Sequence, residues 1–575
     1  MCSAQIRSSE TAKRRRIRYH RFVTSYYVEN FGCRATQADG AAIERQFEER
    51  GLARASTVTQ AELVVLNTCT VTAAADQDAR AAIRRVQRQN PKAKIVVTGC
   101  YAQRAPEEIA ALPGVACVVG NSHKHQLAEI ALRGRSDTHV HEKCRFPGVE
   151  LSNGVEVGGD AEGDNDFEWR TSSAAKTAES EGTLAPAGSA FIPLNALAPR
   201  IESRIFVSDI FAHTELIAAP VFDAANERTR PNLKVQEGCD NRCSFCVIPY
   251  VRGQSRSLPL DEIIREVNTL VEAGYREVVI SGINLGRWGR DLAASRLQTP
   301  DLRLQTSDLG NGLATEVRWL RSDAGFPRFE DLVRAILSET SLEKLRISSV
   351  EPMDWSDELI ALVAESPRIA KHAHVPLQSG SDAVLRRMHR KYRPWHYREK
   401  IEKIRAAMPT AAIGADVMAG FPGETDAEFE ATRRLIEDLP FTYLHVFTYS
   451  ARPGTPAANM RDHIPVNVAR ERNRILRELG AEKKQAFIRS FIGKTVDAIT
   501  LSSTYSLSSR AESIDLLANQ SGAGEGPAVF AETIFTEALT ENYLKLRLTG
   551  RHQPNRWLRA RVEDVQGEVL VGNAL

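Results

Sequence analysis

The chain of 575 residues lacks a long apolar run. No stretch of about eighteen consecutive apolar residues occurs, so we expect no membrane-spanning segment and no membrane partner. The basic residues 1–22 lack the apolar core of a secretory signal, and we interpret them as a disordered tail. These absences favour a cytoplasmic protein.

Net charge and cysteine are also scarce. Lys and Arg number 75 against 73 Asp and Glu, which gives a formal net charge of +2. A nucleic acid would therefore have to contact local basic patches rather than a globally basic surface. The chain has nine cysteines and no recognisable secretion signal, which indicates a reducing compartment where thiols stay free or bind metal.

The apolar pattern divides the rest of the chain into four regions. In residues 23–146 short apolar runs alternate with helical patterns, which predicts a parallel sheet of the Rossmann or flavodoxin-like kind. Residues 225–465 contain six strand candidates separated by helices, typical of a partial (βα)6 barrel with its chemistry at the carboxyl ends of the strands. A linker helix is predicted at 466–492, and four strand candidates predict a small β-barrel at 493–575. The fold class is therefore α/β with a small β-barrel at the end.

Three polar segments interrupt these regions. Residues 147–205 are a low-complexity insert rich in Gly, Ser, Ala and acidic residues, which cannot bury enough apolar surface to offset chain entropy. We expect a surface loop at 289–326 and a Ser/Gly-rich interruption of the last region at 503–528.

Cys239, Cys243 and Cys246 stand on one loop after the first strand of the predicted barrel. Three thiolates so placed are soft ligands suited to an iron–sulfur cluster or to zinc. A structural zinc site needs a fourth ligand, and no histidine lies nearby in the sequence. A four-iron cluster can take three cysteines and leave one iron open for a substrate, so we favour the cluster.

Cys33, Cys69 and Cys100 each close a strand of the predicted N-terminal sheet. The carboxyl ends of parallel strands lie along one edge, where open α/β sheets bind their ligands. One cysteine so placed would be an ordinary core thiol, but three indicate a second cluster that is again one ligand short. The remaining cysteines lack this placement and receive no function: Cys2, Cys117 and Cys144.

Both cysteine motifs, together with others in the same order, resemble those of the methylthiotransferases, a family of radical S-adenosylmethionine enzymes. One of these motifs departs from the usual Lys-Val-Asn version after its cysteine but keeps the cysteine itself. The resemblance covers nearly the whole chain apart from the tail and the three inserts. It is carried by NFGCRATQADG, VVLNTCTVT, VVTGCYAQR, EGCDNRCSFCVIPYVRG, HVPLQSGSDAVLRRMHRKY, ADVMAGFPGETDAEF and HVFTYSARPGTPAA.

The resemblance implies two [4Fe-4S] clusters and S-adenosylmethionine as cofactors. The central cysteines would hold the cluster that cleaves S-adenosylmethionine, and the N-terminal cysteines an auxiliary cluster that carries the sulfur. A radical would remove hydrogen from an unactivated carbon and a methylthio group would replace it, a step that no side-chain base can perform. An electron donor such as flavodoxin or ferredoxin is implied, and no catalytic residue is expected beyond the cluster ligands.

Five further residues are candidate contacts to S-adenosylmethionine or substrate, because each follows a strand of the predicted barrel. For the first two the alternative is a plain turn between strand and helix, and for the others an ordinary polar contact or helix cap. The five are Gly282, Asn284, Glu351, Gln378 and Ser379.

The last region resembles the TRAM module, a small β-barrel associated with RNA binding. Basic side chains neutralise phosphates and aromatic rings stack on splayed bases, whereas the alternative is an ordinary strand face with alternating charges. The candidate RNA-binding residues are Tyr543, Lys545, Arg547, Trp557 and Arg559.

Within the family, the segments VVISGINLGRWGRDL, LRISSVEP and RGQSRSLPLDEIIREV look most like the MtaB branch. That branch adds methylthio to carbon 2 of threonylcarbamoyladenosine next to the anticodon of transfer RNA, and we expect this activity from a monomer. The alternatives are isopentenyladenosine in transfer RNA or an aspartate of a ribosomal protein. A non-catalytic iron–sulfur protein that binds RNA is a third alternative, but a purely structural cluster gains nothing from an open iron.

Overall fold

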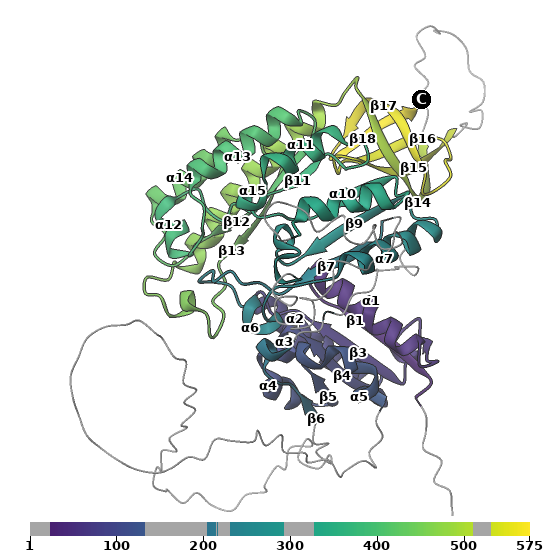
Figure 1. Ribbon diagram of the computed structural model, residues 1–575, viewed down its shortest axis with the longest axis vertical. Coiled ribbons are helices and arrows are strands. Elements are labelled where there is room, and N and C mark those ends of the chain that lie inside the picture. Colours follow the sequence, from purple (N-terminus) through teal and green to yellow (C-terminus); the bar gives the residue numbers. More distant parts are fainter. Residues whose placement is uncertain (1–22, 133–203, 214–215, 217–229, 293–326, 510–530) are drawn as a thin grey trace, which may run out of the picture. The chain divides into compact units, whose positions relative to one another are not determined.

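A computed structural model describes residues 23–132, 204–213, 216, 230–292, 327–509 and 531–575, all within one compact unit (Figure 1). The predicted tail, almost all of the insert at 147–205 and most of the segments at 289–326 and 503–528 lie outside these residues. The same holds for Cys2 and Cys144. No helix in the described part of the chain is long and apolar enough to cross a membrane.

The N-terminal region is built on a parallel sheet with the strand order β2-β1-β3-β4-β5-β6. Its strand β3 is buried along its whole length, as expected for a strand covered on both faces. Leu63 and Val65 pack in the same core as α1 and α5, whereas Val64 and Leu66 pack in the same core as α2. The elements are β1 (Ser25–Asn30), α1 (Arg34–Glu48), β2 (Ala53–Arg54), β3 (Leu63–Thr68), α2 (Ala73–Gln89), β4 (Lys94–Gly99), α3 (Cys100–Arg104), α4 (Pro106–Ala110), β5 (Val115–Val119), α5 (Leu127–Leu132) and β6 (Arg204–Phe206).

The central region contains the six predicted parallel strands and a short seventh, β8, which is antiparallel to β7. They form two sheets of order β10-β9-β7-β8 and β11-β12-β13. Two isolated parallel bridges, Leu345 to Ile369 and Ser349 to His374, connect the sheets, and one hydrophobic core runs beneath both. The strands are β7 (Asn232–Glu237), β8 (Arg256–Ser257), β9 (Glu277–Gly282), β10 (Lys344–Ile347), β11 (His372–His374), β12 (Ala412–Ala419) and β13 (Tyr443–Thr448). The helices are α6 (Ile248–Arg252), α7 (Leu260–Glu272), α10 (Phe329–Glu339), α11 (Asp357–Glu365), α12 (Asp382–Arg387), α13 (Pro394–Ala407) and α14 (Asp426–Asp438).

A long helix, α15 (Val466–Arg489), leads to a closed barrel of strand order β14-β15-β16-β18-β17. The predicted fold class is thereby confirmed in all three regions. The barrel has one more strand than the sequence pattern predicts, because β15 mixes threonine and acidic residues with its apolar residues and gives no strong alternation. Its strands are β14 (Thr495–Ser509), β15 (Ala531–Thr540), β16 (Lys545–Thr549), β17 (Trp557–Gln566) and β18 (Val569–Ala574).

Candidate functional site

Three cysteines lie at the carboxyl ends of β1, β3 and β4, which are neighbours in the sheet. Cys33 precedes α1, Cys69 follows β3 directly and Cys100 begins α3. Gly32 has a φ of +95°, and a Cβ atom there would lie 2.6 Å from Cβ of Cys69. Only glycine permits both this backbone conformation and this approach, so the first two cysteine loops are held against each other.

Burial raises the pKa of the Cys69 thiol to about 11, and the neighbouring Cys100 and Cys33 add to the rise. A thiol with such a pKa is protonated at neutral pH when no metal is bound. A metal centre at this edge must therefore displace the proton as it binds, because the thiolate is the ligand.

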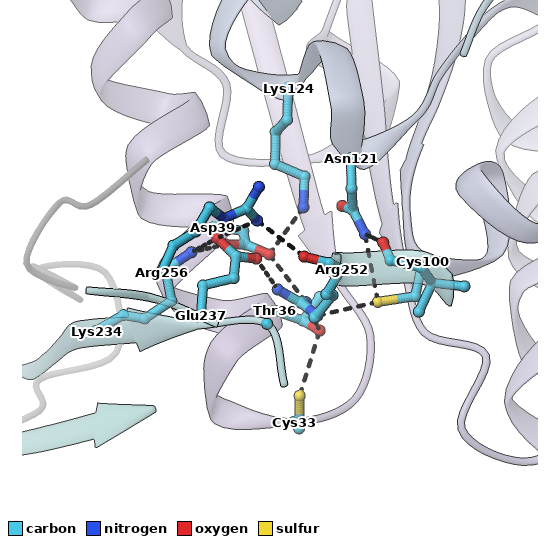
Figure 2. Close-up of polar contacts among 12 residues, drawn as sticks. Cys33, Thr36, Asp39, Cys100, Asn121, Lys124, Lys234, Glu237, Arg252 and Arg256 are labelled. Carbon is cyan, nitrogen blue, oxygen red and sulfur yellow. Dashed lines mark hydrogen bonds and ion pairs between the residues drawn. The ribbon is translucent and has the colours of Figure 1, made fainter. Parts of the chain in front are cut away.

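The sulfur of Cys100 accepts two buried hydrogen bonds, one from Nε of Arg252 at 3.2 Å and one from Nδ2 of Asn121 at 3.6 Å (Figure 2). Arg252 also donates to Oγ1 of Thr36 at 3.3 Å, and that oxygen lies 3.6 Å from the sulfur of Cys33. Arg252 thus contacts one cysteine directly and a second through Thr36.

The central cysteines lie on the loop between β7 and α6. The sulfur of Cys239 accepts from the backbone N–H of Asn241 at 3.4 Å and lies 3.7 Å from Nδ2 of Asn284. The sulfur of Cys243 accepts from Nη1 of Arg390 at 3.3 Å. Both groups of cysteines therefore face cationic or amide donors, which stabilise iron-bound sulfur and adjust its potential.

Neither cysteine group is spaced for a single metal ion. In the part of the chain that the structure describes, one group of three potential ligands has its atoms within 4.8 Å of one another: His374, Asp416 and His445. The cysteine sulfurs are spread more widely, as expected if each binds a different iron of a cluster. Three sulfurs at each site, with donors directed at them, fit two clusters.

The structure brings three of the five candidate cofactor contacts near the central cysteine loop: Gly282, Asn284 and Glu351. Asn284 reaches Cys239, and its backbone N–H donates to Oε1 of Gln236 at 2.7 Å. The Gln236 side chain also packs so closely on Gly282 that a Cβ atom there would lie 2.9 Å from it. Glu351 forms a hydrogen bond and ion pair with Arg390, the donor to Cys243.

The other two candidates differ from each other. Gln378 adopts a φ of +64°, and its Oε1 is buried with no partner among the described residues. Such strain costs about 1–3 kcal/mol and concentrates at ligand sites. Oγ of Ser379 lies 3.1 Å from Oγ1 of Thr432 and accepts from the N–H of Ser381, so these contacts fix the turn before α12.

Five buried ionic side chains join the N-terminal region to the first strand of the barrel (Figure 2). Asp39 of α1 pairs with Lys124 at 2.8 Å, Lys234 at 2.5 Å and Arg252 at 3.0 Å. Glu237 of β7 pairs with Lys234 and Arg252 at 2.9 and 2.5 Å. Burial opposes ionisation, yet the three cations hold the pKa of Asp39 well below its usual range. This network, the buried ion network, lies beside both cysteine loops.

Arg252 and Arg390 are functional candidates that the sequence pattern did not reveal. Both stand inside motifs that carry the family resemblance, VIPYVRG and MHRKY, and this was the available signal. Their burial and their contacts to sulfur depend on residues about 150 positions away in the chain, since Arg252 meets Cys100 at a separation of 152 and Arg390 meets Cys243 at 147.

The five candidate RNA-binding residues lie in separate places. Tyr543, in the turn between β15 and β16, accepts a hydrogen bond from Nη2 of Arg34 at 3.1 Å. The Trp557 ring faces Nζ of Lys344 at 4.9 Å. Lys545 and Arg559 are exposed and Arg547 is half-buried, on strands that β18 separates.

Comparison with known proteins decides the family. Residues 25–120 match the model of the uncharacterized protein family UPF0004, and residues 233–436 match that of the radical SAM superfamily. The chain is 32% identical over 472 residues to the threonylcarbamoyladenosine tRNA methylthiotransferase MtaB of Bacillus subtilis, covering 81% of this chain and 83% of that protein. It belongs to the methylthiotransferase family. Radical S-adenosylmethionine enzymes of this family carry two [4Fe-4S] clusters.

This methylthiotransferase has relatives of more than one kind. A tRNA-2-methylthio-N(6)-dimethylallyladenosine synthase of Novosphingobium aromaticivorans is 31% identical over 478 residues, covering 83% of this chain and 86% of that protein. Among solved structures, the radical S-adenosylmethionine methyltransferase TsrM of Kitasatospora setae is similar, with a TM-score of 0.44 and 14% identity. That likeness covers 76% of this chain and 73% of the other.

Proposed function

We propose that this methylthiotransferase converts threonylcarbamoyladenosine next to the anticodon of transfer RNA into its 2-methylthio derivative. The observation that carries the proposal is the two groups of three cysteines, which come from two regions of the chain. Arg252 connects these regions, because it donates to Cys100 and pairs with Glu237, two residues before Cys239. The substrate in the name of the Bacillus subtilis relative supports the choice of nucleoside.

The chain's own side chains hold and orient the cofactors. Cys33, Cys69 and Cys100 would hold one cluster, and the loop with Cys239, Cys243 and Cys246 the other. When bound, the clusters and S-adenosylmethionine supply the one-electron chemistry that replaces a carbon-bound hydrogen with a methylthio group. Asn284 contacts Cys239, and Glu351 holds Arg390, the donor to Cys243. We assign both, with Gly282, Gln378 and Ser379, to the S-adenosylmethionine pocket.

Transfer RNA would contact the exposed basic residues Lys545 and Arg559 and the half-buried Arg547. We also assign Tyr543 and Trp557 to the RNA-binding surface of the C-terminal barrel, where their rings face Arg346 and Lys344 of the central region. The enzyme would act as a monomer in the cytoplasm, and a flavodoxin or ferredoxin would supply the electron.

The test is nucleoside mass spectrometry of transfer RNA from cells that lack the gene and carry a plasmid copy. We expect 2-methylthio-threonylcarbamoyladenosine to return with the wild type but not with Cys69→Ala or Cys239→Ala. Cys117→Ala is the matched control for Cys69→Ala, because Cys117 is about as buried as Cys69 but packs in the hydrophobic core from β5. Cells that carry Cys117→Ala should contain as much 2-methylthio-threonylcarbamoyladenosine as cells that carry the wild type.

A second candidate substrate is isopentenyladenosine, favoured by the almost equal identity to the dimethylallyladenosine synthase. The same measurement decides between the two. If the isopentenyl nucleoside is the one that disappears and returns, the proposed substrate is wrong and the chemistry stands. If no nucleoside changes, a protein target replaces transfer RNA.

A further inference from the structure

Three arginines from distant parts of the chain converge on Tyr543. Arg34, which directly follows Cys33, donates to the hydroxyl group at 3.1 Å. The guanidinium carbons of Arg230 and Arg346 lie 5.5 and 5.2 Å from the centre of the Tyr543 ring. We call Arg34, Arg230 and Arg346 the arginine cluster. Arg34 begins α1, Arg230 lies just before β7, and Arg346 lies on β10. The cluster is therefore next to the loop that carries Cys33.

Negative charge does not balance the arginine cluster. Glu277 accepts from Nε of Arg346 at 2.6 Å and lies 3.8 Å from Nη1 of Arg230. The nearby carboxylate of Glu541 pairs with Lys344 instead. Among the residues that the structure describes, no carboxylate forms an ion pair with Arg34. Three cations therefore share one carboxylate, which leaves capacity for an anionic ligand.

Arg346 shows where such a ligand would bind. Its side chain is 1% exposed, and its Nη2 has no hydrogen-bond partner in the described part of the chain. A buried cationic donor without an acceptor is unfavourable, so native proteins seldom leave one unpaired. Arg34 is exposed by contrast, so a ligand can reach the arginine cluster from that side.

Uncharged polar groups lie next to the cations. The His372 ring stacks on Tyr543 with centroids 5.3 Å apart, and its Nε2 lies 2.7 Å from the hydroxyl of Tyr443. That hydroxyl is 3.0 Å from Nδ1 of His374. Burial and the nearby arginine charges hold the pKa of His372 well below its usual range, so the ring is neutral at pH 7. These groups suit the hydroxyl and amide atoms of a ligand.

We propose that the arginine cluster binds the carboxylate of the threonylcarbamoyl group, with His372 and Tyr443 beside its neutral polar atoms. This inference rests on the proposed function. A threonylcarbamoyl group ends in a carboxylate, which guanidinium groups bind in a bidentate manner. An isopentenyl group has no charge and no polar atom, so it would leave the arginines desolvated and unpaired. The cluster is thus a specificity determinant, since such sites reject the analogue that lacks the polar group.

The first test compares anticodon stem-loop RNAs that differ in one group. One carries threonylcarbamoyladenosine and the second its methyl ester, which has the same shape without the charge. A third carries isopentenyladenosine. Binding to the full-length protein is measured by fluorescence anisotropy. We expect the acid to bind about 10- to 100-fold more tightly than the ester, from the loss of charge-assisted hydrogen bonds.

The second test uses variants of Arg34, whose exposure makes a folding defect a minor concern. Arg34→Gln should reduce the preference for the acid over the ester about tenfold or more, and Arg34→Lys should keep part of it because the charge remains. Arg50→Gln is the matched control. Arg50 is an exposed arginine just beyond the end of α1 that donates to the backbone oxygen of Gln46 at 2.9 Å. It should retain the whole preference.

The outcomes separate this inference from the proposed function. If the wild type binds acid and ester equally, or if Arg34→Gln keeps the full preference, the arginine cluster does not bind the carboxylate. The function stands in that case as long as the wild type still methylthiolates the threonylcarbamoyl RNA. If the wild type modifies only the isopentenyl RNA, the proposed function itself is wrong.

Discussion

A single side chain, Arg252, contacts a predicted cluster ligand and both acids of the buried ion network. It donates to the sulfur of Cys100 and pairs with Asp39 and Glu237. A guanidinium group can serve all three because its donors are arranged in a planar fork. Lysine would keep the charge, but its single ammonium group could not contact Cys100, Asp39 and Glu237 at the same time.

Arg252→Lys is therefore expected to lower the midpoint potential of the auxiliary cluster. A hydrogen bond to an iron-bound sulfur stabilises the reduced state, so its loss makes reduction harder. One hydrogen bond of about 0.5–1.5 kcal/mol corresponds to about 20–60 mV for one electron. A redox titration followed by electron paramagnetic resonance measures the shift, with Arg50→Lys as the control. An unchanged potential would show that Arg252 acts on packing alone.

Asp39 makes the stability of the cluster-free chain depend on pH. Its pKa is held well below the usual value of about 3.9 by Lys124, Lys234 and Arg252, despite burial. The stabilisation is therefore complete above about pH 4 and is lost as the pH falls toward the folded pKa. Asp39→Asn should reduce the free energy of unfolding by about 3–5 kcal/mol at pH 7.

Urea unfolding followed by circular dichroism, at pH 7 and in steps below pH 4, measures this effect. The difference between the wild type and Asp39→Asn should narrow as the pH falls, because the wild-type carboxylate loses its advantage. A difference that stays constant down to pH 3 would contradict this account of the buried ion network.

At the scale of single elements, the loops after β1 and β3 depend on one close contact. Gly32 has a φ of +95° and no space for a side chain, since its Cβ atom would meet Cys69 at 2.6 Å. Gly32→Ala should separate the two cysteine loops and abolish the auxiliary cluster. Iron and sulfide content should fall to about half, because one of two clusters is lost.

Gly51→Ala is the matched control for that prediction. Gly51 has a similar φ of +77°, but nothing lies within 4 Å of the position of its Cβ atom. The control should lose about 1 kcal/mol of stability from backbone strain and keep its full iron content. Equal iron loss in both variants would mean that backbone strain, rather than the contact with Cys69, is responsible.

The elements also explain what sequence could and could not predict. The run LVVLNT before Cys69 predicts a buried strand, and parallel strands place their carboxyl ends at one edge of the sheet. The local sequence pattern was therefore enough to predict which edge of the sheet carries the cysteines. Apolar and polar residues alternate only weakly in β15, so the sequence pattern does not predict this strand. The contact of Tyr543 with Arg34 spans 509 positions, and no local signal could give it. The basic and aromatic alternation around Tyr543 predicts a surface patch, but it does not reveal the contacts of Tyr543 with three arginines and His372.

At the scale of the whole molecule, the proposed function predicts that transfer RNA contacts exposed basic residues of the C-terminal barrel. The double variant Lys545→Gln with Arg559→Gln removes two exposed cations of that surface. Each phosphate contact contributes a salt-dependence slope of about 0.7–0.9. We expect weaker transfer RNA binding, and a slope of log affinity against log salt that is smaller by about 1.5.

Binding isotherms at several salt concentrations measure the slope. Lys92→Gln is the control, because Lys92 is equally exposed but lies in the N-terminal region before β4. An unchanged slope in the double variant would remove Lys545 and Arg559 from the RNA-binding surface.

The contact between Arg34 and Tyr543 also orders events during biosynthesis. All six predicted cluster ligands have been translated once residue 246 is added, whereas the arginine cluster gains its tyrosine only 297 residues later. At about 5–20 residues per second, this interval lasts about 15–60 s. All six cysteines are thus available for cluster assembly before Tyr543 can complete the proposed substrate pocket.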